Sequence, residues 1–482
     1  MTRRIMGPFN RVEGDLEVTL DIEEERVKTA QVSSSLYRGF EQMLQGKEPG
    51  DALVYTPRIC GICSVSQSVA AARALADLQG VTPPPNGDLA INLILANENV
   101  ADHLTHFYLF FMPDFARETY RSEPWYPMVE KRFRAQAGTA AQEMLPARAQ
   151  FMHLMGLMAG KWPHSLAIQP GGTTRAIEMQ EKARLQAILF GFRRFLENTL
   201  YGDSLEHIVA LDSTAALEQW IDARDPESSD FRRFLEVARQ LDLQQLGRGN
   251  DRFMSYGAYR LQGEPIFKQG LWDQEAQLLD TSRITEDVSH SWMAHQTGPK
   301  HPFEGITLPD ADVEHAYTWC KAPRLDGQVV EVGALARQQV DGHPLIRELV
   351  SDSGGNVRNR VIARLLEIAR VVMRMEAWAK ELKPGEAICH HKPFPQEAQG
   401  FGLVEAARGS LGHWIKIKHG RILNYQIIAP TTWNFSPRDN EGQPGALEIA
   451  LEGATLRAGE KEPVSVQHIV RSFDPCMVCT VH

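Results

Sequence analysis

The feature that most constrains this chain is a set of two cysteine pairs, each spaced C-x-x-C, placed far apart along the sequence. The first pair is Cys60 and Cys63, and the second, Cys476 and Cys479, lies just before His482. Together they supply four thiolates, a soft donor set that suits zinc, iron or nickel. Because more than four hundred residues separate the pairs, only the fold can unite them. Two alternatives stay open at this point: a structural zinc site, and two pairs that never meet in space.

Charge and composition argue against several classes of protein. The 482 residues carry a formal net charge of −10, whereas a protein that binds nucleic acid needs a basic face for the phosphates. The basic start at Arg3 and Arg4 is followed by no apolar stretch, so it does not read as a secretory signal. The apolar run at residues 107–112 is far shorter than the roughly 18 residues that span a bilayer. We expect a cytoplasmic protein with no membrane span and no nucleic-acid partner, in which paired cysteines favour metal or redox chemistry over disulfides.

Hydrophobic patterns predict strands near both ends of the chain and helices between them. Apolar and polar residues alternate over 16–22, as in a half-buried strand, and residues 27–32 return as its partner. Residues 413–417 and 422–428 flank a polar turn and predict a second hairpin. Helical patterns cover residues 64–75, 91–111, 175–200 and 357–382.

These patterns predict an α+β fold that is predominantly helical, with N-terminal and C-terminal β-hairpins around a helical core. The sequence contains no internal repeat and no low-complexity segment, so we expect a single large domain over residues 1–482. Residues 200–330 are more polar than the rest, and we expect them to lie at the periphery.

Seven short motifs accompany the cysteines along nearly the whole chain. They are R-V-E-G at 11–14, R-G-F-E at 38–41, R-I-C-G-I-C at 58–63, D-H-x-x-H-F-Y at 102–108, R-G-x-L-G-H-W at 408–414, P-T-T-W-N at 430–434 and D-P-C-x-x-C-x-x-H at 474–482. Each alone is weak, because an isolated glutamate or histidine is more often a surface or capping residue than a catalyst. Together, from Arg11 to His482, the chain resembles the large subunit of nickel–iron hydrogenases, and we expect the fold of that subunit.

The resemblance implies that the four cysteines hold a nickel–iron centre. By position, Cys60 and Cys476 look like terminal nickel ligands, and Cys63 and Cys479 look like bridges between nickel and iron. In this family the iron also carries carbon monoxide and cyanide ligands.

Three further positions match residues that surround the centre in this family. Arg408 and Thr431 match residues near the diatomic ligands, and an arginine can donate charge-assisted hydrogen bonds to cyanide. Asp102 matches an acid that pairs with this arginine.

The resemblance also implies a route for protons. Glu13 matches a glutamate that relays protons from a terminal nickel thiolate, for which we expect Cys476 to be the first base. Arg408 is the alternative base, although the high pKa of a guanidinium argues against it.

A second metal site is implied near the end of the chain. Glu41 and His482 match ligands of a magnesium ion in this family, and a backbone carbonyl near Ile428 is the third candidate ligand. Oxygen donors suit this hard cation, whereas histidine is not its usual choice.

The implied reaction is the reversible conversion of H2 into protons and electrons, and the electrons must leave the site. Beyond the four centre cysteines the chain has only Cys320 and Cys389, which cannot hold a series of iron–sulfur clusters. We therefore expect a heterodimer with a separate iron–sulfur small subunit. For the two remaining cysteines, the simpler interpretation is buried packing.

The chain departs from most members of this family at three positions near the centre. At the position of Gln67, relatives that turn over quickly usually carry histidine. At the positions of Ile62 and Phe110, relatives usually carry valine and leucine, respectively. The last two residues match positions that line the end of the gas channel, and larger side chains there should slow O2 more than H2. The simpler alternative for each is repacking of the core.

These departures, and a sequence that stops at His482 where many large subunits are made with an extension, resemble the regulatory branch of the family. Its members act as slow, O2-tolerant H2 sensors that signal through a histidine kinase and control hydrogenase genes. The first alternative is an ordinary uptake hydrogenase that passes electrons to a respiratory carrier. The second, a metal-free subunit such as that of respiratory complex I, is disfavoured because all four cysteines are present.

Overall fold

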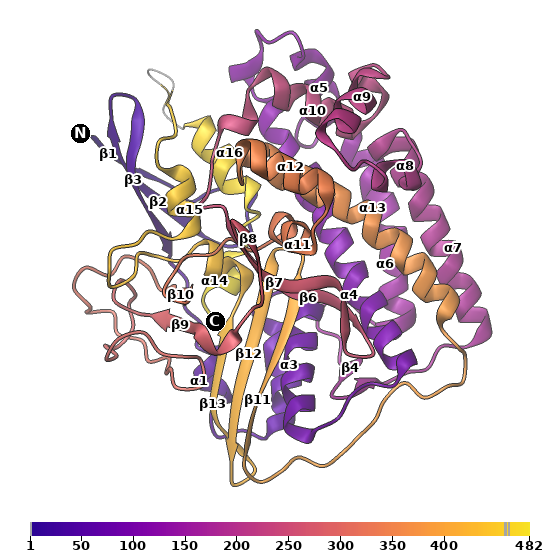
Figure 1. The fold of residues 1–482 in the computed structure, drawn as a ribbon, viewed down its shortest axis with the longest axis vertical. Helices are drawn as coiled ribbons and strands as arrows, with labels where there is room; N and C mark the ends of the chain where they lie inside the picture. The colour runs from indigo at the N-terminus through magenta and orange to yellow at the C-terminus, as the bar shows by residue number, and fades with distance from the viewer. Residues whose placement is uncertain (1, 457–459, 461–462) are drawn as a thin grey trace.

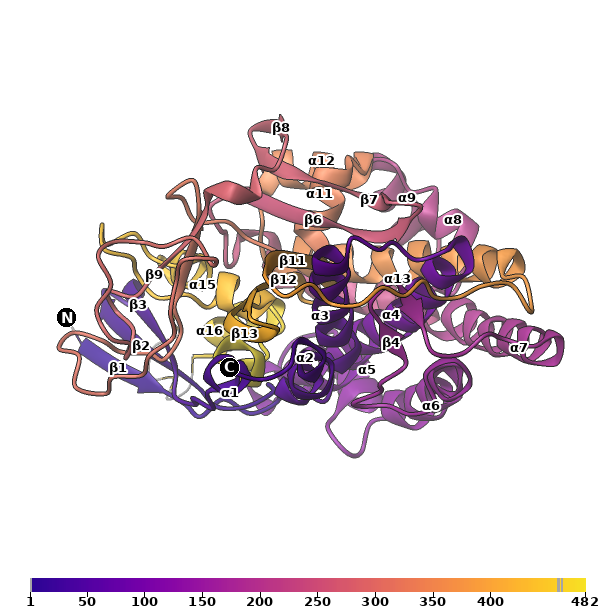
Figure 2. The same ribbon diagram turned by 90° about the horizontal axis from the view of Figure 1, so that it is seen from below.

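The computed structural model describes residues 2–456, 460 and 463–482. Its centre is a group of long helices: α4 (Pro85–Thr105), α6 (Thr139–Ala159), α7 (Met179–Phe195) and α13 (Val357–Glu381). Figures 1 and 2 show these four helices side by side, and α4 packs against both α6 and α13. In α13 the apolar side chains of Val361, Leu365, Ile368 and Val372 are fully buried. The helices predicted over 91–111, 175–200 and 357–382 are confirmed, with shifted ends.

Two of those helices continue as short stretches of π-helix. One covers His106–Phe111 at the end of α4, and the other covers Leu196–Tyr201 at the end of α7. At its start, α7 is four residues shorter than its pattern, because Glu178 and Glu181 form a capping box there.

The N-terminal sheet consists of β1 (Thr2–Met6), β2 (Leu16–Glu23) and β3 (Arg26–Ser34), paired antiparallel in that order. The predicted hairpin is β2 and β3, and Leu16, Val18 and Leu20 face the core. The strand β1 has no apolar alternation and is mostly exposed, so its sequence carries no strand signal.

The C-terminal sheet consists of β11 (Ala398–Ala406), β12 (Gly409–Lys418) and β13 (Arg421–Ile428). The predicted hairpin is β12 and β13, and its turn places His419 and Gly420 at positive φ, as tight hairpin turns require. Helix α3 (Ser64–Gln79) packs across β11. A β-carbon at Gly402 would lie 2.0 Å from the carbonyl oxygen of Ala70, so glycine is needed for this approach. The sheet thereby fixes the helix that follows the first cysteine pair.

The expectation that residues 200–330 are peripheral needs a correction. The segment contains β6 (Arg252–Leu261), β7 (Glu264–Asp273) and β8 (Glu275–Gln277), which form one sheet, and β9 (Ile284–Asp287), which pairs with β10 (Ala322–Leu325). Strand β6 is buried over residues 252–259, and all of β10 is buried. The polar composition of this segment suggests an exposed position. Several of its polar side chains are nevertheless buried, because they have ion-pair or hydrogen-bond partners inside the protein.

The remaining elements are short and surround this framework. They are α1 (Phe40–Leu44), α2 (Ala52–Tyr55), α5 (Tyr126–Phe133), α8 (Leu205–Val209), α9 (Thr214–Asp222), α10 (Asp230–Gln240), α11 (Ala334–Asp341), α12 (Pro344–Ser353), α14 (Pro430–Asn434), α15 (Ala446–Leu451), α16 (Val464–Ser472), α17 (Met477–Thr480), β4 (Ile168–Gln169) and β5 (Gly172–Thr173). The fold is thus α+β and predominantly helical, as the sequence predicts.

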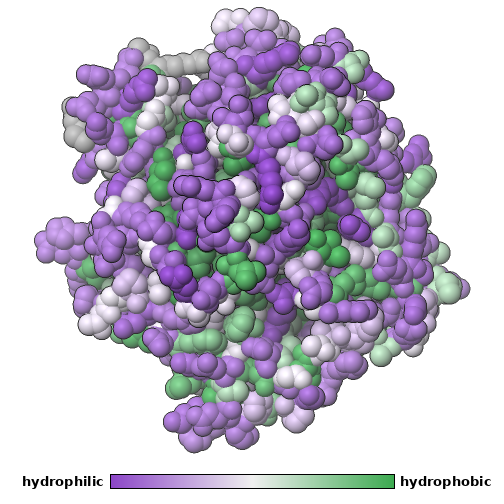
Figure 3. All heavy atoms as spheres, in the orientation of Figure 1, coloured by the Kyte–Doolittle hydropathy of each residue, from purple (hydrophilic) through white to green (hydrophobic). Residues whose placement is uncertain are grey.

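The last residues of the chain lie inside the molecule, next to α14 and β13 (Figure 1). Cys476, Cys479 and His482 are all buried. The face drawn in Figure 3 is mostly hydrophilic, with small scattered hydrophobic areas. Among the described residues, no helix combines the length and the apolar character that a membrane crossing needs.

Candidate metal centre

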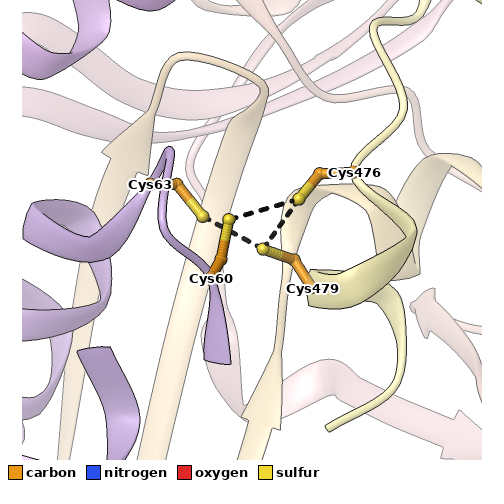
Figure 4. Close-up of side chains that lie close together, drawn as sticks. All are labelled: Cys60, Cys63, Cys476 and Cys479. Carbon is orange, nitrogen blue, oxygen red and sulfur yellow. Dashed lines mark hydrogen bonds between the residues drawn. The ribbon is translucent and has the colours of Figure 1, made fainter. Parts of the chain in front are cut away.

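The fold brings the two cysteine pairs together. The Sγ atoms of Cys63 and Cys479 are 3.0 Å apart, those of Cys476 and Cys479 are 3.0 Å apart, and those of Cys60 and Cys476 are 3.5 Å apart. All four sulfur atoms lie within 4.8 Å of one another, and all four residues are buried (Figure 4). The alternative that the pairs never meet is therefore excluded.

Backbone contacts hold the second pair against the first motif of the chain. The N–H of Met477 donates to the carbonyl of Glu13 at 2.6 Å, and the N–H of Glu13 donates to the carbonyl of Pro475 at 3.4 Å. Gly14 has a positive φ of 83°, and a β-carbon there would lie 3.1 Å from the Val478 side chain. The R-V-E-G segment thus serves as the backbone support of the second C-x-x-C pair.

Arg38 joins the two cysteine segments directly. Its Nη2 atom donates to the carbonyl of Ile59, which precedes Cys60, and to the carbonyl of Val478, which precedes Cys479. Sequence analysis quoted this arginine within a motif and gave it no role, because nothing in the local pattern shows that it spans two distant segments.

The donor set fits soft transition metals. Burial raises the pKa of the Cys476 and Cys479 thiols, so thiolates packed this closely need the positive charge of a bound metal. Four sulfur donors suit nickel and iron, and they suit zinc equally well. The identity of the metal therefore rests on the surroundings and on the comparisons below.

Arg408 lies between two buried carboxylates. Its guanidinium contacts Asp102 and pairs with the Asp474 carboxylate at 3.1 Å, and its Nε donates to the Asp474 carbonyl at 2.8 Å. Burial alone would lower the pKa of Arg408, but Asp102 and Asp474 raise it well above its usual range. Burial raises the pKa of Asp102 to about 7, against the opposing effect of Arg408. Arg408 therefore stays protonated, which weighs against it as a base.

Two further predicted residues reach the second cysteine pair. Thr431, in α14, accepts a hydrogen bond at Oγ1 from the N–H of Cys476 at 3.2 Å. Glu13 is half-buried, and its pKa is raised first by burial and then by the charge of Cys60, while Arg408 lowers it. Glu13 is thus joined to Cys476 through the backbone and to Cys60 through charge.

Glu41 and His482 meet beside the centre, as the sequence predicts. His482 Nδ1 is 2.9 Å from the Cys479 carbonyl, and its Nε2 is 3.8 Å from a carboxylate oxygen of Glu41. The predicted carbonyl needs a correction, since His482 Nε2 lies 2.6 Å from the carbonyl of Ile427 rather than that of Ile428. Successive residues of a strand face opposite sides, so the carbonyls of Ile427 and Ile428 point in opposite directions.

Lys321 is a functional candidate that sequence analysis missed. Its Nζ atom donates to Glu286 and Gln426 at 2.9 Å each and lies 3.7 Å from Glu41. Both Glu286 and Lys321 are buried. Nothing in the local sequence marks this lysine, because its partners come from distant segments. Glu41, the Ile427 carbonyl and His482 fit a divalent cation, and the Glu286 carboxylate offsets the extra positive charge of the lysine.

Gln67 does not stand alone. Its Oε1 atom is 2.8 Å from His413 Nε2, and His413 Nδ1 is 2.8 Å from the Tyr425 hydroxyl, with all three residues buried. Burial lowers the pKa of His413 well below its usual range, so the imidazole is neutral. The three hydrogen-bonded side chains of Gln67, His413 and Tyr425 therefore carry no charge. They lie beside Cys63, whose carbonyl accepts the N–H of Gln67 at 3.2 Å.

The two predicted channel residues are both partly buried, Ile62 next to Cys63 and Phe110 in the π-helical stretch after α4. The two spare cysteines lie elsewhere: Cys320 is buried, with its Sγ donating to the Lys321 carbonyl, and Cys389 is partly buried beside Pro170. Over residues 2–456, 460 and 463–482, the four centre cysteines form the one detected group of three or more metal-ligating side chains.

Glu98 is a second residue that sequence analysis missed. From α4, its buried carboxylate accepts hydrogen bonds from the N–H groups of Val65 and Ser66, both at 2.9 Å, and from Trp162 Nε1 at 3.0 Å. The hydroxyl of Ser66 adds a bond at 3.1 Å, and that of Ser64 adds one at 3.4 Å. Glu98 thus caps the first turn of α3 from another helix and fixes the segment that begins directly after Cys63.

Comparison with known proteins assigns the family. The family model described as nickel-dependent hydrogenase matches residues 38–119 and 139–482. The large subunit of the periplasmic [NiFeSe] hydrogenase of Desulfomicrobium baculatum is 28% identical, covering 99% of this chain and 94% of that protein. The uptake hydrogenase large subunit of Azotobacter chroococcum mcd 1 is 28% identical, covering 100% of this chain and 95% of that one.

A solved structure agrees over the full length. The Ni-Fe-Se hydrogenase from D. vulgaris Hildenborough, in its reduced state, superposes with a TM-score of 0.85 and 30% identity, covering 100% of both chains. With the cysteine tetrad in place, these findings exclude a purely structural zinc protein. The chain belongs to the nickel-dependent hydrogenase family, as a large subunit that binds the nickel–iron active site.

Proposed function

We propose that this hydrogenase acts as a slow, O2-tolerant H2 sensor that works in the cytoplasm and controls the expression of hydrogenase genes. The observation that carries the proposal is the uncharged, buried chain Gln67–His413–Tyr425 beside Cys63. Glutamine cannot take up a proton, whereas a histidine at position 67 could bind and release one near neutral pH. The side chain at position 67 therefore cannot carry protons here. The bulkier Ile62 and Phe110 support the same proposal, because they would narrow a gas channel.

The centre would be held by the thiolates of Cys60, Cys63, Cys476 and Cys479. When bound, the centre would supply the site at which H2 is split into protons and electrons. The guanidinium of Arg408 and the hydroxyl of Thr431 would be hydrogen-bond donors for its carbon monoxide and cyanide ligands.

The residues of this chain hold and move the proton. Arg408 is fixed as a cation by Asp102 and Asp474, so it orients charge and does not accept a proton. The carboxylate of Glu13 accepts the proton from a terminal thiol, with Cys476 as the first base. The backbone bridge between Glu13 and Pro475–Met477 keeps this donor and acceptor in one rigid unit.

A magnesium or similar divalent ion would lie among Glu41, the Ile427 carbonyl and His482. Such an ion would tie the last residue of the chain to α1 and β13, which joins metal binding to the closure of the cysteine tetrad.

The proposal includes two protein partners. The electrons need clusters that this chain does not supply, because Cys320 and Cys389 are the two cysteines outside the tetrad and two thiolates cannot hold a series of clusters. We therefore propose an iron–sulfur small subunit as the direct partner and a histidine kinase as the recipient of the signal.

The second candidate function is an uptake hydrogenase, which the names of several relatives favour. The rate of H2 oxidation and its sensitivity to air distinguish a sensor from an uptake hydrogenase. A sensor oxidises H2 with a redox dye far below the roughly 10 s⁻¹ that is typical of enzymes, and keeps this rate after exposure to air. In cells, Cys476→Ser should abolish H2-dependent transcription of hydrogenase genes. Fast turnover that air destroys, with transcription unchanged in the variant, would favour the uptake enzyme.

A further inference from the structure

A cavity of about 550 Å³ lies away from the metal centre, at the far end of α3. Its walls come from α3, from the start of α4, from the tip of the β6–β7 hairpin and from β11. This volume falls in the range of small-molecule sites, roughly 300–1,000 Å³. No residue of the predicted metal centre lines it.

Two arginines in this cavity lack a carboxylate partner. Arg73, from α3, donates from Nη1 to the carbonyl of Leu403 at 2.6 Å. Arg260, from β6, has a buried Nε atom without a hydrogen-bond partner. Within the described part of the chain, neither guanidinium has a carboxylate oxygen within 4.0 Å. Most other buried arginines of this protein are paired, for example Arg337 with Glu367 and Arg360 with Glu331.

The charges of these arginines are poorly compensated. Burial and, second, the positive charge of Arg260 lower the pKa of Arg73 to about 9, against the opposing effect of Asp88. Burial likewise lowers the pKa of Arg260, against the pull of Glu264 and Asp88. Both arginines are half-buried, and a cation whose charge is incompletely compensated there costs free energy that a bound anion would recover.

Two carboxylates line the same cavity, and backbone groups already occupy both. Asp88 accepts the N–H of Gln262 at 2.8 Å, and Asp77 accepts the N–H of Phe401 at 3.0 Å. Burial raises the pKa of Asp88, which weakens it as a counterion for the two arginines.

The remaining residues that line the cavity indicate what the rest of the ligand must be like. Val69, Ala72, Ile91 and Leu403 present apolar side chains to the cavity. The side-chain oxygen of Asn92, also in the lining, is buried and has no hydrogen-bond donor. A ligand that satisfies all of these groups has an anionic end, an apolar body and a hydroxyl that donates to Asn92.

We propose that this cavity binds a small organic carboxylate with an apolar body, held by the guanidinium groups of Arg73 and Arg260. The planar fork of arginine matches the two oxygens of a carboxylate. This site is independent of the hydrogenase chemistry, and it adds a ligand of a different class to the same chain.

The test uses calorimetric titration of the purified protein with benzoate, 3-hydroxybenzoate, benzyl alcohol and inorganic phosphate at low ionic strength. Benzoate should bind, 3-hydroxybenzoate should bind more tightly because its hydroxyl is free to donate to Asn92, and benzyl alcohol should bind at least tenfold more weakly than benzoate. Arg260→Gln and Arg73→Gln should each weaken benzoate binding by about tenfold or more, which corresponds to the loss of one charge-assisted contact. The matched control is Arg184→Gln, at an exposed position of α7, which should leave binding unchanged.

Several outcomes would overturn the proposal. Benzoate that fails to bind, or that binds equally to both cavity variants, would remove the site. If phosphate binds as tightly as benzoate, the apolar part of the ligand contributes nothing to binding. The cavity would then be a site for inorganic anions and not for organic carboxylates. If Arg73→Gln does not fold, the Arg260→Lys variant tests the proposal by itself. This substitution keeps the positive charge but removes the planar guanidinium, so benzoate should bind several-fold more weakly.

Discussion

Glu13 and Cys476 are joined as a parallel β-bridge, although more than four hundred residues separate them in the sequence. The bridge holds a carboxyl-bearing residue against the segment that carries a predicted nickel ligand. The proposed proton acceptor is thus part of the same backbone unit as the second cysteine pair. This relationship links the start of the chain, its end and the proposed route for protons.

Glu13→Gln should stop proton transfer while leaving the backbone bridge intact, because only the carboxyl group changes. We expect H2 oxidation and H2/D2 exchange to fall by about a hundredfold or more, which is within the range that general acid–base groups contribute. Nickel and iron content should stay at the wild-type level. Glu17→Gln, at an exposed position of β2, is the matched control. Exchange at the wild-type rate in Glu13→Gln would remove this residue from the proton route.

Ile62→Val combined with Phe110→Leu should widen the proposed gas channel. H2 oxidation measured before and after exposure to air should become O2-sensitive, because a wider apolar passage admits O2 as well as H2. The control pair is Ile306→Val with Phe190→Leu, since both of these side chains are exposed. If the channel variant tolerates O2 as the parent does, side-chain bulk at these two positions is not the protective feature.

Glu98→Gln should loosen the start of α3. The substituted amide would place an N–H group against the N–H of Val65 or Ser66, so one buried donor loses its acceptor, at a cost of about 1–3 kcal/mol. Amide hydrogen exchange at Val65 and Ser66 should accelerate by about tenfold, and nickel retention should fall because Cys63 directly precedes this turn. Glu118→Gln, an exposed position, should change neither. Unchanged exchange at Val65 and Ser66 would show that the capping bonds do not hold the turn.

The buried carboxyl of Glu448 predicts a pH dependence of stability away from the metal centre. Burial raises its pKa from 4.5 to about 7, although Val32 and Tyr317 donate hydrogen bonds to it. The folded chain therefore binds this proton more tightly than the unfolded chain, so stability falls as pH rises between about 4.5 and 7 and is level above that range.

Glu448→Gln should remove this component of the pH dependence. Between pH 5 and pH 8 the free energy of unfolding of the wild type should drop by roughly 3 kcal/mol more than that of the variant. Urea unfolding at the two pH values measures the difference. Equal drops in both proteins would mean that Glu448 titrates normally.

Sequence reasoning went furthest where chemistry needs a specific residue type at a fixed spacing. The four cysteines and Glu41, Asp102, Arg408, Thr431 and His482 all lie at or beside one buried site, as expected. Both predicted hairpins are present. Alternation over residues 16–22 reflects one buried face, whereas the second hairpin is marked by its polar turn, and its last strand ends in four buried residues.

The rest could not be predicted, for physical reasons. The roles of Arg38, Glu98 and Lys321 depend on partners from distant segments, and no local pattern encodes such contacts. The carbonyl beside His482 belongs to Ile427 and not to Ile428, because successive residues of a strand point to opposite sides and an error of one position changes the side. The buried strand β6 was missed because the 200–330 segment around it is polar on average, although Phe253, Met254 and Tyr256 in the strand are buried and apolar or aromatic.

The central claim is that the four cysteines hold a nickel–iron centre with carbon monoxide and cyanide on the iron. The most direct measurement is the infrared spectrum of the purified protein in the region where metal-bound carbonyl and cyanide absorb, with metal analysis of the same sample. The account predicts carbonyl and cyanide bands with nickel and iron near one each per chain. It also predicts that Cys476→Ser loses both bands and nickel, while Cys320→Ser keeps them. A silent spectrum from protein that contains zinc, or bands that persist in Cys476→Ser, would contradict it.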